Sequence, residues 1–176
     1  MSTYIYTEKI KYDFHADKRK SMLDAELRLI NAGLSEHYGT PSGEVKLLYT
    51  SNGKPYLSGE SMPFISITNK HDYVMTALSD IPVGIDMEIP DSALTVEKAC
   101  RLSNRFLLPL EAKAVMEAGP AMFYRIWTFK ESYTKAYDLK LPEVLGSVSY
   151  FDKLAHVEYV ETPEFVYSVY SASEQL

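Results

Sequence analysis

The chain has 176 residues, a net charge of −6 and 46% hydrophobic residues. That length can bury one sizeable core or two small, closely packed lobes. The acidic balance argues against general binding to nucleic acid, so an anionic ligand would need a local basic patch. No apolar run reaches the roughly 18 residues of a membrane-spanning helix. The single cysteine, Cys100, cannot form an intramolecular disulfide. We therefore expect a cytoplasmic protein that binds neither membranes nor nucleic acid.

The first half of the chain alternates between strand and helix patterns. Residues 2–11 alternate as a strand does, and residues 17–38 carry apolar side chains at helical spacing before Gly39. Further strand patterns follow at residues 45–49, 64–68, 73–79 and 83–89.

The second half is mostly helical and ends in a hairpin. Helices are predicted at residues 96–103, 110–118 and 121–137, and strands at 155–160 and 165–171 with a turn near Pro163. The fold class expected is α+β, with two similar α/β lobes related by a pseudo-two-fold. Each lobe would be a long helix packed on a small, mostly antiparallel sheet. Residues 1–80 would form the N-terminal lobe, and residues 81–176 the C-terminal lobe with the functional site.

Two carboxylates lie close together in the strand predicted at residues 83–89. Asp86 and Glu88 are two positions apart, so both side chains leave the same face of the strand. A pair of solvated acids at a strand end is the commoner arrangement. The apolar neighbours Ile85 and Met87 favour a shared site instead, because a strand with one buried face must direct its acids elsewhere.

A second charged group lies in the helix predicted at residues 121–137. Glu131 and Lys135 share a helix face, and alone they indicate a surface ion pair worth about 0.3–0.5 kcal/mol. Together with Asp86 and Glu88 they would supply carboxylate oxygens for Mg²⁺ and a lysine for a phosphate group.

The two segments 84–88 and 127–135, in this order and about forty residues apart, resemble the two-part signature of the 4′-phosphopantetheinyl transferase superfamily. The resemblance is closest to the larger monomeric type that activates peptide synthetases such as surfactin synthetase. Lys54, within Gly-Lys-Pro at 53–55, is similar to a turn of that family. The segment 64–69 occupies the place of the family's Asn-Ile-Ser-His-Ser stretch.

The resemblance implies a set of site residues. Asp86, Glu88 and Glu131 would hold Mg²⁺, Glu131 and Lys135 would be catalytic, and Lys135 would also contact the pyrophosphate of coenzyme A. Lys54 would lie near the nucleotide. Basic residues of the first helix would grip coenzyme A phosphates, with Arg19 among the candidates Lys18, Arg19, Lys20 and Arg28.

One position departs from the family pattern. Asn69 stands where the family has a histidine that contacts the 3′-phosphate of the nucleotide. A neutral amide can donate a hydrogen bond to phosphate but supplies no charge. Either binding of the nucleotide is weaker, or Lys70 or His71 takes over.

The implied reaction is that of a holo-[acyl-carrier-protein] synthase. A serine of an apo acyl or peptidyl carrier protein would attack the β-phosphate of coenzyme A and release 3′,5′-adenosine bisphosphate. Glu131 is the first candidate for the base that accepts the serine proton, and Glu111 the second. Lys130 is expected to line the cleft or meet the partner. Two lobes in one chain could build the whole site in a monomer.

Two other functions are compatible with parts of the sequence. A catalytically weakened protein of the same fold that binds coenzyme A or a nucleotide is favoured by Asn69. The presence of Lys135 and all three metal-site carboxylates argues against it. A metal hydrolase of another family would explain the acids but not the block at residues 127–135.

Overall fold

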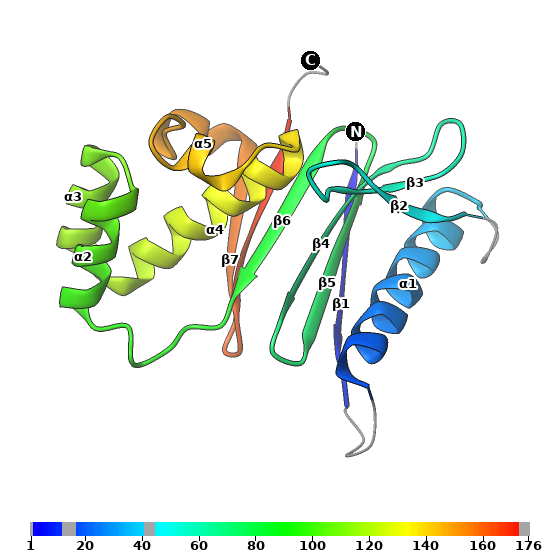
Figure 1. Ribbon diagram of the computed structural model, residues 1–176, viewed down its shortest axis with the longest axis horizontal. Coiled ribbons are helices and arrows are strands. Elements are labelled where there is room, and N and C mark those ends of the chain that lie inside the picture. Colours follow the sequence, from blue (N-terminus) through cyan, green and yellow to red (C-terminus); the bar gives the residue numbers. More distant parts are fainter. Residues whose placement is uncertain (1, 12–16, 41–44, 173–176) are drawn as a thin grey trace.

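The computed structural model describes residues 2–11, 17–40 and 45–172, and it confirms the α+β class (Figure 1). In the N-terminal half, three strands form an antiparallel sheet in the order β1-β5-β4, and β2 and β3 form a separate hairpin. The elements of this half are β1 (Thr3–Lys9), α1 (Lys18–His37), β2 (Leu47–Tyr49), β3 (Pro55–Leu57), β4 (Phe64–Lys70) and β5 (Tyr73–Ser79).

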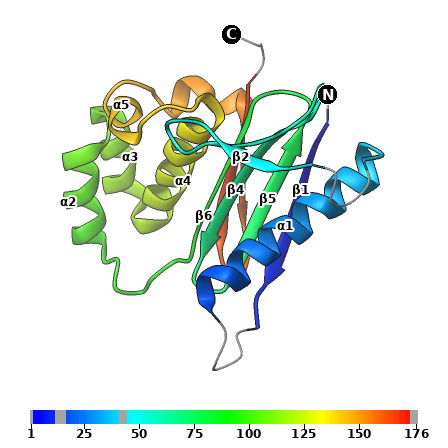
Figure 2. The same cartoon turned by 45° about the vertical axis from the view of Figure 1, so that its right-hand side comes forward.

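In the C-terminal half, a second antiparallel sheet has the order β6-β8-β7. Its elements are β6 (Val83–Glu88), α2 (Val96–Phe106), α3 (Pro109–Ala118), α4 (Pro120–Tyr137), α5 (Leu141–Leu145), a 3₁₀ helix (Phe151–His156), β7 (Val157–Glu161) and β8 (Val166–Ser171). Figure 2 shows α1 lying across the N-terminal sheet and α4 lying beside β6. Each half thus has a long helix against a three-stranded sheet, while a pseudo-two-fold and a boundary at residues 80/81 stay predictions.

Three segments differ from the sequence-based expectation. The strand β3 was not predicted, because it is only three residues long and begins at Pro55, which has no N–H to donate to a sheet. The five-residue helix α5 is too short for a helical period to show. Residues 155–156, expected in the closing hairpin, complete the 3₁₀ helix Phe151–His156 instead.

The two halves share one hydrophobic core. Its buried members come from β5 in the first half and from β6, β8 and the turn before β8 in the second: Met75, Ala77, Val83, Ile85, Met87, Phe165 and Val169. Because this core is built from both halves, neither half can bury its inner sheet face alone.

Side-chain hydroxyl groups join β4 to β6 across the boundary. The hydroxyl of Ser66 accepts a hydrogen bond from the N–H of Ile85 at 3.0 Å, and the hydroxyl of Thr68 accepts one from the N–H of Met87 at 3.3 Å. Backbone donors of β6 that would otherwise be buried and unpaired are thereby satisfied. We call this contact the hydroxyl seam.

None of the helices within the described ranges is long and apolar enough to cross a membrane.

The helix α4 approaches β6 most closely at Gly84. A Cβ atom built on Gly84 would lie 1.8 Å from the carbonyl oxygen of Ser132 and 2.6 Å from the backbone nitrogen of Ala136. Both neighbours are backbone atoms, which cannot turn aside as the end of a side chain can. Gly84 is therefore required for this contact.

We predict that Gly84→Ala destabilises the protein by on the order of 3–5 kcal/mol, because the added methyl group forces α4 away from β6. Gly146→Ala is the matched control, since a Cβ atom added there would meet nothing within 4 Å. Urea denaturation of both variants checks the prediction. An unchanged midpoint for Gly84→Ala would mean that the helix does not touch the strand there.

Candidate functional site

The helix α4 carries half of the candidate site. It begins at Pro120, whose fixed φ suits the first helical position. It ends at Asp138, which adopts the left-handed conformation with φ 55° and ψ 38°. Phe123, Ile126 and Phe129 are buried in the core of the C-terminal half. The neighbouring face of the helix directs Glu131 and Lys135 toward β6.

Asp86 is the most buried acid of the site, with 7% of its surface exposed. Its Oδ1 atom accepts hydrogen bonds from Lys135 Nζ at 2.7 Å and from the hydroxyl of Thr68 at 3.3 Å. Its Oδ2 atom is buried and has no hydrogen-bond partner among the described residues. Burial raises the pKa of Asp86, against the opposing effect of Lys135. One strong acceptor atom is thus left open inside the protein.

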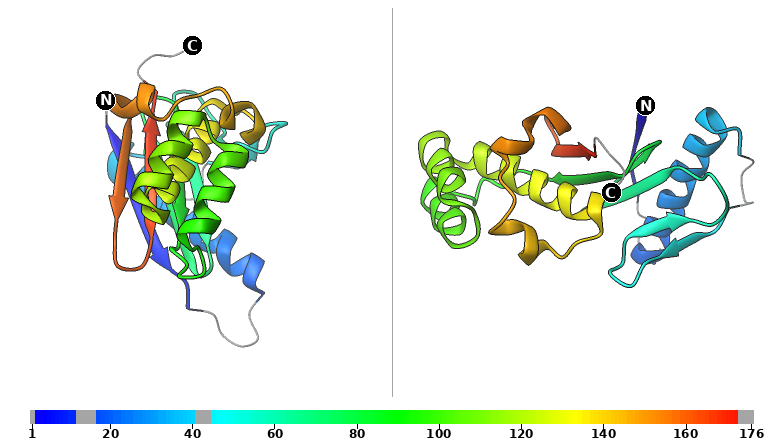
Figure 3. Two further views of the ribbon diagram at one scale, coloured as in Figure 1. Left: turned by 90° about the vertical axis from the view of Figure 1, so that its left-hand side faces the viewer. Right: turned by 90° about the horizontal axis from the view of Figure 1, so that it is seen from above.

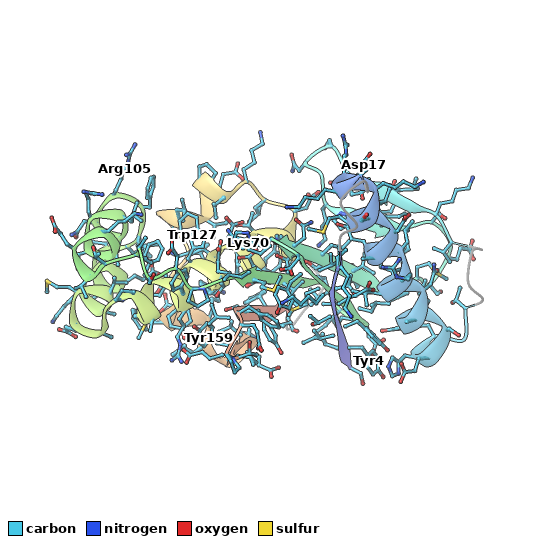
Figure 4. The ribbon with its side chains drawn as sticks, turned by 90° about the horizontal axis from the view of Figure 1, so that it is seen from below. Tyr4, Asp17, Lys70, Arg105, Trp127 and Tyr159 are labelled. Carbon is cyan, nitrogen blue, oxygen red and sulfur yellow. The ribbon has the colours of Figure 1, made fainter. Side chains whose placement is uncertain are left out.

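Glu88 lies two positions further along β6, on the same face as Asp86. Its Oε2 atom pairs with Lys70 Nζ at 2.6 Å. Lys70 comes from the end of β4, so this ion pair joins the two halves. Figure 4 places Lys70 near the middle of the molecule, between Asp17 at the start of α1 and Trp127 on α4.

Lys135 and Glu131 complete the cluster from the side of α4. Lys135 Nζ donates to the carbonyl oxygen of Ile85 at 3.0 Å as well as to Asp86. Burial, followed by repulsion from Asp86 and then Glu88, raises the pKa of Glu131 to about 7. Three acids therefore face two lysines, and the cluster has surplus negative charge.

The acids do not form a ready-made metal site. Within the ranges that the structure describes, no three His, Cys, Asp or Glu side chains are grouped closely enough to hold an ion. The donor set nevertheless suits Mg²⁺, which prefers carboxylate oxygens. Asp86 Oδ2 lacks a partner among these residues, and Glu131 is a buried carboxyl group whose pKa is raised by burial and then by the charge of Asp86, which a cation would offset. Binding of Mg²⁺ by Asp86, Glu88 and Glu131 stays a proposal.

A cavity of about 200 Å³ lies beside the acidic cluster. Lys54 lines it from the β2–β3 hairpin, and Lys135 lines it from α4. Lys54 Nζ donates to the carbonyl oxygen of Ala136, and burial lowers the pKa of this lysine. The structure thus brings together Lys54, expected near the nucleotide of coenzyme A, and Lys135, expected at its pyrophosphate.

The three residues considered as alternatives for contacting the 3′-phosphate lie in different surroundings. Asn69 Nδ2 donates to Glu26 Oε1 on α1 at 3.2 Å, whereas Lys70 pairs with Glu88. Successive side chains of a strand leave opposite faces, which explains the divergence. His71 lies in the exposed turn after β4, with φ 55°. Glu26 places an acid, with a pKa raised by burial, beside Asn69.

The basic residues of α1 are divided between two environments. Lys18, Arg19 and Lys20 lie in its exposed first turn, where Asp17 caps the helix by accepting from the N–H groups of Arg19 and Lys20. Arg28 is engaged in an ion pair with Glu8 of β1. Arg19 therefore stays a candidate for phosphate binding, and Arg28 has another role.

Two expectations are wrong. Glu111 cannot be a base, and Lys130 does not line the cleft, because both side chains are fully buried and pair with each other at 2.9 Å. Glu111 also accepts from the N–H of Tyr150 at 2.8 Å, and Lys130 also donates to the carbonyl oxygens of Leu145 and Val148. The pair ties α3, α4 and the segment after α5 together. Lys130 lies four residues after the buried Ile126, on the same face of α4, and this spacing could have predicted that Lys130 is buried.

We predict that Glu131→Gln stabilises the metal-free protein at pH 8 by about 1–3 kcal/mol but has little effect near pH 4.5. A carboxyl group whose folded pKa of about 7 exceeds its unfolded value of 4.5 reduces stability as the pH rises between those values. Glu117→Gln, which alters an exposed acid of α3, is the control and should bring no such gain. Thermal unfolding in a chelator at both pH values checks this, and equal shifts for Glu131→Gln at pH 4.5 and 8 would contradict it.

Several curated 4′-phosphopantetheinyl transferases are similar to this chain in sequence. HetI, a 4′-phosphopantetheinyl transferase from Nostoc sp., is 28% identical over 131 residues, which cover 70% of this chain and 54% of HetI. The 4′-phosphopantetheinyl transferase gsp from Aneurinibacillus migulanus is 29% identical over 128 residues, covering 72% of this chain and 52% of the relative. A 4′-phosphopantetheinyl transferase from Bacillus subtilis is 24% identical over 132 residues, covering 73% and 56%.

The chain spans about half the length of the curated relatives it matches. The model of the 4′-phosphopantetheinyl transferase superfamily matches residues 82–174, more than half of the chain. That match contains the acids of β6, the whole of α4 and the closing hairpin. The chain belongs to the 4′-phosphopantetheinyl transferase superfamily.

Proposed function

We propose that this protein transfers the 4′-phosphopantetheine group of coenzyme A to a serine of an apo acyl or peptidyl carrier protein, in a reaction that depends on Mg²⁺. The observation that carries the proposal is the position of Lys135. Its ammonium group is bonded to Asp86 in the acidic cluster, and the residue lines the same cavity as Lys54. Acids for a metal and lysines for phosphates thus meet at one place.

Charge neutralisation and positioning are the main tasks in such a transfer. Lys54 and Lys135 would bind the pyrophosphate of the donor in the cavity between them. Asp86, Glu88 and Glu131 would hold Mg²⁺, which when bound offsets negative charge on phosphate oxygens. The side chains would keep the β-phosphorus in line with the attacking serine oxygen.

Glu131 is the base we propose. Without a metal, burial and the neighbouring acids raise the pKa of Glu131 to about 7. A bound Mg²⁺ would keep the carboxyl group ionised, and an oxygen that the ion leaves free could then accept the proton. The serine oxygen would bond to the β-phosphorus as its proton passes to Glu131. The bond from that phosphorus to the bridging oxygen would break, 3′,5′-adenosine bisphosphate would leave, and the carrier would become the holo form. All these residues belong to one chain, so we propose that a monomer is sufficient.

We predict that Asp86→Asn and Glu131→Gln each lower the transfer rate at least about a hundredfold, because each removes a carboxylate that would hold Mg²⁺. The wild type is incubated with coenzyme A, Mg²⁺ and a set of apo carrier proteins, and the product is measured by mass spectrometry. Glu117→Gln, which alters an exposed acid of α3, is the control. Full activity of both site variants would contradict the proposed site. Binding of coenzyme A without transfer to any carrier would favour the weakened binding protein.

The hydrogen bond between Glu26 and Asn69 predicts that the protein discriminates little between coenzyme A and dephospho-coenzyme A. A carboxylate next to Asn69 disfavours a 3′-phosphate there, and Lys70 is engaged by Glu88. We therefore expect the wild type to use coenzyme A and dephospho-coenzyme A with KM values within about threefold. Combining Glu26→Gln with Asn69→His should raise the preference for coenzyme A about ten- to a hundredfold, through a charge-assisted hydrogen bond. Strong discrimination by the wild type, surviving in the double variant, would show that the 3′-phosphate binds elsewhere.

A further inference from the structure

The tip of the β2–β3 hairpin is bonded to the C-terminal end of α4. The hydroxyl of Thr50 donates to Asp138 Oδ1 at 3.1 Å, and Asn52 Nδ2 donates to the carbonyl oxygen of Asp138 at 2.8 Å. Figures 1 and 3 show the hairpin reaching from the N-terminal half toward the end of α4. A residue of one half thus receives two hydrogen bonds from the other.

Asp138 is suited to this role by its backbone conformation. The left-handed residue ends α4, and its N–H donates to the carbonyl oxygen of Thr134 to close the last turn. The helix therefore uses the donor of Asp138 and leaves its two acceptors, the carboxylate and the carbonyl oxygen, for the hairpin. Asparagine and glycine tolerate the same conformation.

The same bonds continue to Lys54. The hydroxyl of Thr50 accepts a hydrogen bond from the N–H of Lys54 at 3.0 Å while it donates to Asp138. Lys54 Nζ donates to the carbonyl oxygen of Ala136, in the last turn of α4. The side chain of Lys54 is thus bonded directly to the end of α4, and its backbone is linked to Asp138 through Thr50.

The hydrophobic packing of the hairpin lies at its base rather than near its tip. Leu57 lies at the base, in the core with Ile65 and Leu34. Tyr49 and Tyr56, further toward the tip, are 53% and 44% exposed. An isolated two-stranded hairpin is marginal in water, so the position of this tip depends on its bonds to Asp138 and on the bond from Lys54 to Ala136.

We propose that Thr50, Asn52 and Asp138 form a latch that positions Lys54 against the donor cavity. The latch residues act through Lys54 and need not touch the reacting atoms. The identity of the ligand as coenzyme A rests on the proposed function. The latch itself rests on the hydrogen bonds between the hairpin and α4.

Such a latch affects the binding of coenzyme A more than the rate of the transfer step. Without it, Lys54 must be ordered when the donor binds, and that cost is subtracted from the binding free energy. The acids of β6, Glu131 and Lys135 are unaffected, so kcat should change little. A latch mutation should therefore raise the Kd and the KM for the donor selectively.

The first test compares paired variants by calorimetry with coenzyme A. Asp138→Gly keeps the left-handed backbone but removes the acceptor, whereas Asp138→Asn keeps an acceptor and removes the charge. Thr50→Val and Thr50→Ser form a second pair. We expect Kd to rise about three- to tenfold in the glycine and valine variants, as for one lost hydrogen bond. The asparagine and serine variants should stay within about twofold of the wild type, by the same reasoning.

The second test asks whether the latch acts through Lys54. In a Lys54→Met background, Asp138→Gly should weaken binding no further, because the group that it positions is gone. Equal losses in both backgrounds would overturn the latch. A merely structural role would lower kcat and Tm together with affinity, which would also overturn it.

The third test needs no ligand. Amide hydrogen exchange in residues 47–57 should be faster in Asp138→Gly than in Asp138→Asn. If the wild type binds no coenzyme A, the proposed function fails, and the exchange rates still decide the latch. Equal exchange in the two variants would refute it.

Discussion

The close packing of α4 on β6 at Gly84 is the constraint on which the site depends. A glycine is the only residue that lets the helix backbone lie so near the strand, since a Cβ atom would lie 1.8 Å from the carbonyl oxygen of Ser132. At this distance Lys135 reaches both the carbonyl oxygen of Ile85 and the carboxylate of Asp86. A helix displaced by the thickness of one side chain would leave these groups apart. The close packing of the two backbones thus determines how near Lys135 lies to the carboxylate of Asp86.

Each half of the protein supplies one lysine to the acids of β6. Lys70 of the N-terminal half pairs with Glu88, and Lys135 of the C-terminal half pairs with Asp86, both acids of β6. The structure gives Glu131 no ion pair with any described residue, and burial together with repulsion from Asp86 and Glu88 raises its pKa. An acidic protein can attract an anionic ligand where basic side chains are concentrated locally. Here the fold gathers them at the junction of its halves, where a ligand can contact both.

The sequence could predict what local periodicity encodes. Alternation in β6 placed Asp86 and Glu88 on one face, and the four-residue spacing placed Glu131 and Lys135 on one face of α4. Contacts between distant segments were beyond its reach: the pair Lys130–Glu111 and the bonds to Asp138 join residues that no local pattern relates. The divergence of Asn69 and Lys70 could have been predicted, because adjacent side chains of a strand leave opposite faces. A resemblance of motifs had grouped them in one phosphate site.

The hydroxyl seam also determines how the two halves are aligned. In an ordinary sheet every residue offers an N–H and a carbonyl group, so a slip of two positions leaves the ladder satisfied. Here only Ser66 and Thr68 can accept from β6, because the next side chains on that face of β4 are those of Phe64 and Lys70. A slip either way would bury an unpaired N–H at a cost of about 1–3 kcal/mol. The hydroxyl groups of Ser66 and Thr68 thus favour a single alignment of β4 with β6. That alignment also fixes where the acids of β6 lie relative to the lysines.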